Sequence, residues 1–430
     1  VANIYGGHEN LEAVEFLKHL NSIFKKEIKG GLLIAEESTA WPQITGSVKE
    51  NGLGFDYKWN MGWMNDFTGY MQCDPYFRNQ HYGELTFSMF YAYSEDFVLV
   101  FSHDEVVHGK SSMLCKMPGE TYEEKAANLR TAYGFMYGHP GKKLLFMGQE
   151  FAQISEWNEN EELPWNILEY PLHKNMQDYV TALNELYRTH PAMYQKDFEQ
   201  EGFEWINCTS AADNIVVFTR KTDKPEETLL FVCNFAPVLH EKYQIGLPFA
   251  GRYKEIFNSD AKQFGGSGKG NSRVRAAKKE EYDGRDYSMQ ITVPPMSMIV
   301  FSCEPAVPKK TAAKKSAAKK PAAEKTAAAK KTGTEKNTAA KKTSMGKSAA
   351  EKKTAAEKSS AKTETVKKAV AEAKKAAAKT AENGRKTAEE AVKAAKETAA
   401  AAVQDVVKKA KKTAAEVKKA ADKATEKKAQ

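Results

Sequence analysis

Two short apolar segments of this chain each end in acidic residues. GLLIAEEST covers residues 31–39, and FVLVFSHDEVVHGK covers residues 97–110. Apolar runs of this length are typical of buried strands in a parallel sheet, and α/β proteins place their chemistry at the carboxyl ends of such strands. The pattern therefore predicts that Glu36 and Asp104 face one cleft. Paired carboxylates suit glycosidic bond chemistry, because one can protonate the leaving oxygen while another stabilises positive charge on the sugar.

The segments around these carboxylates alternate between helical and strand-like patterns, as in a parallel sheet with helices outside. We expect helices at residues 9–29, 123–138 and 176–187, and strands at residues 31–37, 53–63, 97–105 and 142–151. Strands and helices in that number make about half of an eight-stranded barrel. After His190, short segments rich in β-branched and aromatic residues predict a small antiparallel sandwich that ends at Cys303.

Charge divides the chain into two parts. Residues 1–303 contain 29 basic and 41 acidic residues, whereas residues 304–430 contain 35 basic and 15 acidic residues. The second part has no aromatic residue and repeats Ala, Lys, Thr and Ser, so we expect a low-complexity tail that is disordered to partly helical. This tail is either a solvated polycation that maintains solubility or a nonspecific, salt-sensitive contact to a polyanion such as nucleic acid.

The sequence indicates no metal site, no cofactor and no membrane span. The five cysteines are scattered and form no CxxC pair, which is simplest to explain by reduced thiols in a cytoplasmic protein. No apolar run approaches the ~20 residues that cross a bilayer. The first residues, VANIYGG, lack an initiator Met and the features of a signal peptide, so the chain is expected to begin partway through a fold.

The carboxylate motifs resemble those of glycoside hydrolase family 13, the α-amylase superfamily, and within it the glycogen branching enzymes. IAEEST and SHDEVVHGK resemble active-site motifs of that family, and NIYGGHENLEA, GFDYKWNMGWM, KMPGE and PGKKLLFMGQEFAQ resemble branching-enzyme segments in the same order. The resemblance implies the carboxyl-terminal half of a TIM (β/α)8 barrel over residues 1–195. It further implies an all-β sandwich domain over residues 200–303, and it does not extend to the tail, residues 304–430.

The same resemblance implies roles for individual residues. Glu36 would be the general acid/base, and Asp104 would stabilise the oxocarbenium-like transition state, with His103 beside it binding the sugar. The implied reaction is retaining: an α-1,4-glucan is cleaved and the chain is transferred to a 6-hydroxyl, which forms an α-1,6 branch. The family's nucleophilic Asp lies upstream of the NIYGG segment, so this chain alone is expected to be inactive. Asp56, Asp66 and Asp74 are the nearest acids, but none occupies the family's position.

Several alternatives stay open at this stage. The chain could belong to an α-amylase-type hydrolase, or it could be a non-catalytic protein that binds glucan or a polyanion. Four tryptophans near strand ends could stack on sugar rings or could fill a core. They are Trp41, Trp59, Trp63 and Trp157. Trp41, which directly follows the AEEST motif, is the preferred substrate contact, whereas Glu37 is expected to support its neighbour rather than react.

Overall fold

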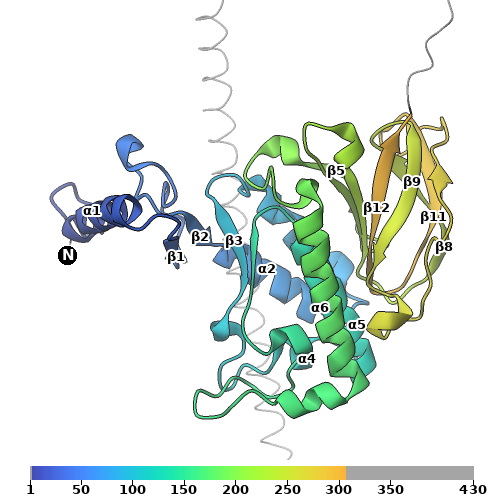
Figure 1. The fold of residues 1–430 in the computed structure, drawn as a ribbon, viewed down its shortest axis with the longest axis horizontal. Helices are drawn as coiled ribbons and strands as arrows, with labels where there is room; N and C mark the ends of the chain where they lie inside the picture. Colours follow the sequence, from blue (N-terminus) through green and yellow to red (C-terminus); the bar gives the residue numbers. More distant parts are fainter. Residues whose placement is uncertain (1, 307–430) are drawn as a thin grey trace, which may run out of the picture. The chain divides into compact units, whose positions relative to one another are not determined.

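A four-stranded parallel sheet forms the centre of the amino-terminal region in this computed structural model, which describes residues 2–306 (Figure 1). The strands lie in the order in which they occur along the chain, and each pairs with the next in parallel. They are β1 (Ile34–Ala35), β2 (Tyr57–Trp59), β3 (Phe97–Phe101) and β4 (Lys142–Leu145). The predicted parallel sheet is therefore confirmed, although its strands are shorter than the apolar patterns indicate.

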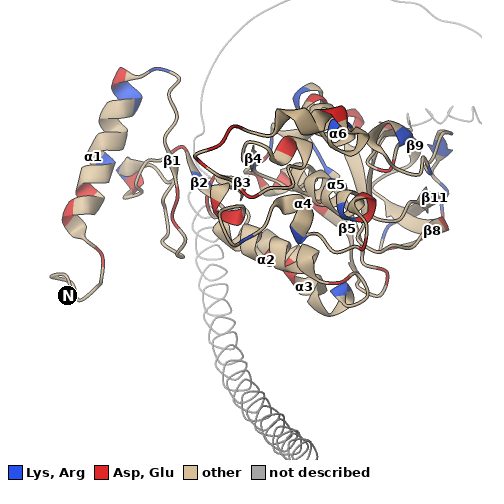
Figure 2. Cartoon of the chain, turned by 90° about the horizontal axis from the view of Figure 1, so that it is seen from below, with Lys and Arg blue, Asp and Glu red and all other residues tan. Residues whose placement is uncertain are grey.

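Helices precede, connect and follow these strands along the chain, except that only a short 3-10 turn, Val48–Glu50, lies between β1 and β2. They are α1 (Leu11–Glu27), α2 (Met61–Gln72), α3 (Tyr82–Thr86), α4 (Met113–Lys116), α5 (Tyr122–Gly138) and α6 (Pro171–Thr189). The start of α5 is fixed by a capping box in which Thr121 and Glu124 exchange side-chain-to-backbone hydrogen bonds. In α1, Glu12 lies in the first turn and Lys25 in the last, which suits the helix dipole. Figure 2 marks the acidic and basic residues along this helix in red and blue.

The prediction of a strand over residues 53–63 holds only for Tyr57–Trp59, which form β2, and is wrong for the residues on either side. Helix α2 begins at Met61, and Asn60 caps it by accepting a hydrogen bond from the Trp63 backbone N at 2.9 Å. The Trp63 side chain is 1% exposed and stacks on Phe67 with ring centroids 5.1 Å apart. Trp63 therefore fills the core and is not available to a sugar.

An antiparallel β region follows the α/β region and confirms the predicted sandwich. One sheet has six strands in the order β10-β9-β12-β7-β6-β5, and the other pairs β11 with β8. The strands are β5 (Phe203–Ser210), β6 (Ile215–Arg220), β7 (Leu229–Asn234), β8 (His240–Leu247), β9 (Gly251–Asn258), β10 (Arg275–Ala276), β11 (Tyr287–Val293) and β12 (Ser297–Pro305). A separate apolar cluster, which includes Val232, Ile291 and Ile299, fills the space between the two sheets.

The outer face of the larger sheet packs against the α/β region. Phe135 of α5 lies edge to face with Phe218 of β6, at a centroid distance of 6.1 Å, and the main apolar cluster runs continuously through both regions. A buried ion pair crosses the same junction, because Arg220 at the end of β6 donates to Asp197 at 2.6 Å. The sandwich thus supports the helices that in turn cover the parallel sheet.

The opposite end of the parallel sheet is less covered. Among the described residues β1 pairs only with β2 (Figure 1). Ile34 in β1 is 45% exposed. Apolar side chains of α1 and its following turn are also exposed, including Phe16 and Leu32. The sequence predicts the disordered to partly helical tail from residue 304, but residues 304 and 305 belong to strand β12, because they continue its pairing with β9. The rest of the predicted tail, from residue 307 to 430, lies outside the described residues.

Candidate functional site

Glu36 follows β1 directly, at the carboxyl end of the strand. Side chains alternate along an extended chain, so Ile34 and Glu36 share one face while Ala35 takes the other. Ala35 is buried, and Ile34 and Glu36 are exposed. The Glu36 carboxylate therefore lies on the open face of β1, where it forms no ion pair with another residue of 2–306.

Glu37 points to a different partner. Lys58 in the middle of β2 is 5% exposed, and its Nζ donates to Glu37 Oε2 at 2.8 Å and to the Thr39 backbone O at 3.1 Å. Partial burial raises the pKa of Glu37, but hydrogen bonds from Lys58 and Thr39 outweigh it and hold this pKa below its usual range. Glu37 is thus a fixed anion that anchors the turn after β1.

His103 and Asp104 lie in a short 3-10 turn, His103–Glu105, that follows β3. A capping box fixes the turn: Ser102 Oγ accepts from the Asp104 backbone N at 3.1 Å, and the buried Glu105 carboxylate accepts from the Ser102 backbone N. The His103 Nε2 lies 3.4 Å from Asp104 Oδ1, with both side chains about half exposed. The turn therefore presents an imidazole and a carboxylate together at the end of a buried strand.

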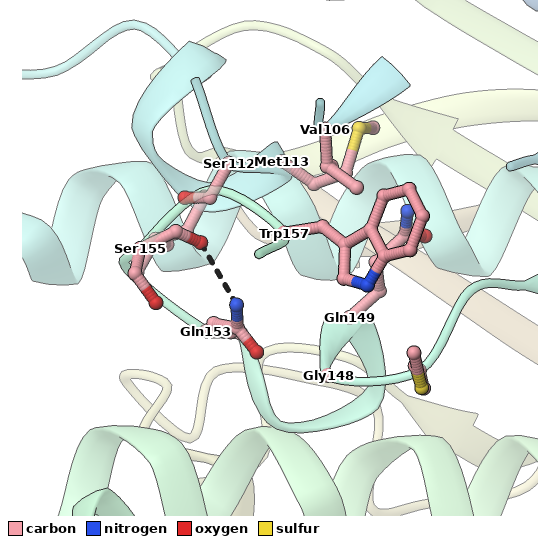
Figure 3. A pocket seen from close by; sticks show the side chains of 11 residues that line it. Val106, Ser112, Met113, Gly148, Gln149, Gln153, Ser155 and Trp157 are labelled. Atoms are coloured by element: carbon pink, nitrogen blue, oxygen red, sulfur yellow. Dashed lines mark hydrogen bonds between the residues drawn. The ribbon is translucent and has the colours of Figure 1, made fainter. Parts of the chain in front are cut away.

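Aromatic rings from the segment after β4 hold His103 in place. Trp157 meets it edge to face at a centroid distance of 5.7 Å, and Phe146 lies 6.0 Å away. Figure 3 shows the Trp157 ring beside Val106 and Gln149, and the Trp157 backbone N donates to the Val106 O at 2.8 Å. Gln149 donates to the Ser102 O at 3.3 Å. This segment thus buttresses the turn that carries His103.

The structure places Glu36 and Asp104 at the same edge of the sheet. Glu36 ends β1, Asp104 follows β3, and β2 lies between these two strands. Neighbouring strands lie about 4.8 Å apart, so the two strands that carry the carboxylates are separated by about 10 Å. An arrangement of this kind can flank a sugar unit bound at the strand ends.

Trp41 lies in the turn after β1 and lines a hollow of about 630 Å³. Trp59 and Tyr91 add aromatic walls, and Glu37 lies at its edge, whereas Glu36 and Asp104 do not line it. Trp41 also packs against a small apolar cluster formed by Ala35, Ile44 and Leu53. The side chain is half-buried, so one face supports the turn and the rest borders the hollow.

None of the three nearest acids lies at the carboxyl end of a strand. Asp56 precedes β2, accepts from the Leu33 backbone N at 2.8 Å and pairs with Lys25 at 2.9 Å. Asp66 lies within α2, and Asp74 caps a turn by accepting from the Tyr76 backbone N at 2.8 Å. Asp56 and Asp74 thus hold nearby backbone in place, and Asp66 belongs to a helix. Within residues 2–306 no group of three His, Cys, Asp or Glu side chains could hold a metal ion.

Sequence reasoning missed the residues that position the candidate catalytic groups. For Lys58 the only local signal was its place in the middle of a short strand. A buried ammonium needs a charged partner, so a lysine there indicates a nearby carboxylate. Gln149 and the contact of Trp157 with His103 had no such signal, since both depend on how the segment after β4 folds back.

Comparison with known proteins identifies this arrangement. Residues 205–304 match the family described as alpha amylase, C-terminal all-beta domain. A parallel α/β region with carboxylates at its strand ends, followed by this domain, defines a chain of the α-amylase superfamily. The chain is 50% identical over 304 residues to the 1,4-alpha-glucan branching enzyme GlgB of Oceanobacillus iheyensis, covering 71% of this chain and 48% of that protein.

Two further relatives carry the same name. The protein from Halothermothrix orenii is 50% identical over 301 residues, covering 70% of this chain and 48% of its own length. The protein from Aquifex aeolicus is 49% identical over 304 residues, covering 71% of this chain and 48% of its own length. The chain belongs to the 1,4-alpha-glucan branching enzyme family, which confirms the resemblance seen in the motifs. It spans about half the length of these relatives.

Proposed function

We propose that this chain supplies the acid/base half of a branching-enzyme active site, in the cytoplasm. The observation that carries the proposal is the exposed Glu36 at the end of β1, in a chain that is 50% identical to a branching enzyme over 304 residues. The substrate would be an α-1,4-glucan, and the product a glucan with a new α-1,6 branch.

Each described site residue has a place in this reaction. Glu36 would protonate the glycosidic oxygen as the α-1,4 bond breaks and would later remove the proton from the incoming 6-hydroxyl. Asp104 would stabilise positive charge on the sugar, and His103 would bind the same sugar. Lys58 supports this assignment, because it neutralises Glu37 and leaves Glu36 as the exposed carboxylate of the pair. The nucleophilic carboxylate would come from the part of the relatives that this chain does not span.

Two other functions make different predictions. If water rather than a 6-hydroxyl attacks, the chain is part of a hydrolase and only shorter linear glucans form. If no covalent intermediate forms, the chain binds glucan without reaction. Attachment of the tail to a polyanion is a separate proposal, supported by its 35 basic against 15 acidic residues over 304–430.

The test is a chimera that joins the amino-terminal half of the Oceanobacillus iheyensis relative to this chain. We expect it to convert amylose to a product from which a debranching enzyme releases chains, and to show α-1,6 anomeric protons by NMR. Glu36→Gln should lower the rate at least about 10³-fold, because the general acid/base is lost. Glu50→Gln, an exposed acid elsewhere, is the matched control and should leave the rate unchanged. Shortened linear products alone would identify a hydrolase.

A further inference from the structure

A second hollow, of about 610 Å³, lies between the segment that follows α2 and two turns of the β region. Tyr76, Asn79 and Gln80 line it on one side, and residues 236–238 line it on the other. Helix α2 starts at the carboxyl edge of the sheet and runs for 12 residues, about 18 Å. The hollow after its last turn is therefore remote from the edge that carries Glu36 and Asp104.

Tyr76 is the most unusual residue of this hollow. Its side chain is 81% exposed, although a tyrosine ring buries a large apolar area when it has a partner. Phe77 supports it from one side, edge to face at a centroid distance of 5.0 Å. Asp74 fixes the turn beneath, because its Oδ1 accepts from the Tyr76 backbone N at 2.8 Å. The ring is thus held by its own segment while its exposed surface has no cover among the described residues.

Arg78 ties both sides of the hollow together. It is completely buried, and its Nη1 donates to the Phe235 O of the β region at 2.8 Å. Its Nη2 donates to the Met71 O in α2 and to Asn128 Oδ1 in α5, both at 2.7 Å. Because one guanidinium joins α2, α5 and the turn after β7, the hollow is formed before any ligand arrives.

The chemistry of the lining favours a neutral, hydroxylated ligand. Asp74 is the one side chain of this lining that is charged at neutral pH, whereas Asn79 and Gln80 present exposed amides that both donate and accept hydrogen bonds. A pyranose ring has C–H faces that pack on an aromatic ring and hydroxyls that bond to amides. A charged peptide or a nucleic acid would find no ionic partner here other than one carboxylate.

We propose that this hollow binds an α-1,4-glucan chain at a docking site separate from the carboxylate edge, with a sugar stacked on Tyr76. The inference rests on the proposed function, since a protein that acts on a long polymer gains apparent affinity when a second site holds the same chain. Asn79 and Gln80 would bond to the hydroxyls of the stacked sugar.

The experiment measures binding of maltoheptaose to the full chain by calorimetry at 150 mM salt (about physiological ionic strength), and retardation of the chain in gels that contain amylopectin. Tyr76→Ala should weaken binding about tenfold, because the stacking surface is lost, whereas Tyr76→Trp should retain it. Phe90→Ala is the matched control, since Phe90 is 87% exposed, has an aromatic neighbour and does not line the hollow. The Phe90→Ala variant should bind maltoheptaose as tightly as the unchanged chain does.

Two results would overturn the docking site. One is the absence of maltoheptaose binding by the unchanged chain, and the other is equal binding by Tyr76→Ala and the unchanged chain. Neither result bears on the branching assay of the chimera, which reports on Glu36. In that chimera, Tyr76→Ala should raise KM for long amylose and leave kcat unchanged. A fall in kcat alone would also contradict a docking role.

Discussion

Lys58 holds Glu37 and leaves its neighbour Glu36 outside the ion pair. The Lys58 Nζ lies 2.8 Å from Glu37 Oε2, and the Lys58 side chain is only 7% exposed. Since adjacent residues of an extended chain point to opposite faces, the two carboxylates are separated both in direction and in electrostatic environment. One ammonium on the neighbouring strand thereby distinguishes a paired, structural anion from an exposed carboxylate that forms no ion pair within residues 2–306.

Lys58→Met should raise the pKa of Glu37 toward its usual range. In the unchanged chain the folded-state pKa of Glu37 lies below its unfolded value, so the stabilisation is present above the unfolded pKa and is lost as pH falls through the folded pKa. The variant should lose the part of this dependence that Lys58 causes, while the Thr39 hydrogen bonds remain, and about 1–3 kcal/mol of stability at neutral pH. NMR titration of the Glu37 carboxyl and urea unfolding measure the two effects. Lys49→Met, at an exposed lysine, should change neither.

Arg220→Met should destabilise the junction between the α/β and β regions. Arg220 and Asp197 are both completely buried and lie 2.6 Å apart, and Lys142 lies 2.8 Å from the same carboxylate. Removal of the guanidinium leaves a buried anion short of a partner, which costs about 3–5 kcal/mol. The free energy of unfolding measures this cost. Lys221→Met breaks the partly exposed pair with Glu204 and should cost less than about 1 kcal/mol. Equal losses of stability in Arg220→Met and Lys221→Met would contradict a special role of the buried Arg220–Asp197 pair at this junction.

The sequence was sufficient to predict the strands and the carboxylates at their ends, because both are local features. The apolar run of β3 is buried at every position from Phe97 to Phe101, and Asp104 follows within a few residues. The lengths of the strands could not be predicted from such local features. In β1 only Ile34–Ala35 pair, since pairing depends on how far β2 extends alongside.

The position of the tryptophans shows where local reasoning stops. Trp59 and Trp63 are close in sequence, yet Trp59 borders a hollow, whereas Trp63 lies on α2 and is buried in the main apolar cluster. The difference arises because Asn60 starts a helix between them, which turns the later ring inward. Trp157 contacts His103 only because the segment after β4 folds back over the turn after β3. A contact of that kind has no signature in the local pattern.

His139 should make stability depend on pH in the acid range. Burial lowers the pKa of His139 to about 3, and the carbonyl of Pro140, Lys143, Arg220 and Asp197 act on it to smaller degrees. The unfolded chain takes up a proton near pH 6.5, so stability contributed by neutral His139 is present above that pH and declines toward pH 3.

The expected decline is at most ~1.4 kcal/mol per pH unit from this single group. Urea unfolding between pH 7 and about pH 4 measures it. His139→Gln should flatten the dependence, even though the variant is less stable at neutral pH, because its Ser88 and Pro140 contacts at 2.8 Å are disturbed. His8→Gln, at an exposed histidine, should retain the full dependence. An unchanged slope in His139→Gln would assign the effect to other groups.

Trp157→Ala should release His103 from its fixed orientation. The two rings meet edge to face at 5.7 Å with an interplanar angle of 84°, so the imidazole protons sense the indole ring current. In NMR spectra of the chain, the His103 ring signals should move toward those of a free histidine in Trp157→Ala and stay near their original positions in Trp157→Phe. If His103 binds the reacting sugar as proposed, the alanine variant should lower kcat of the chimera more than the phenylalanine variant, because a mobile imidazole would bind that sugar less well. If both variants left the His103 signals unchanged, Phe146 alone would suffice to hold the ring, and Trp157 would have no positioning role.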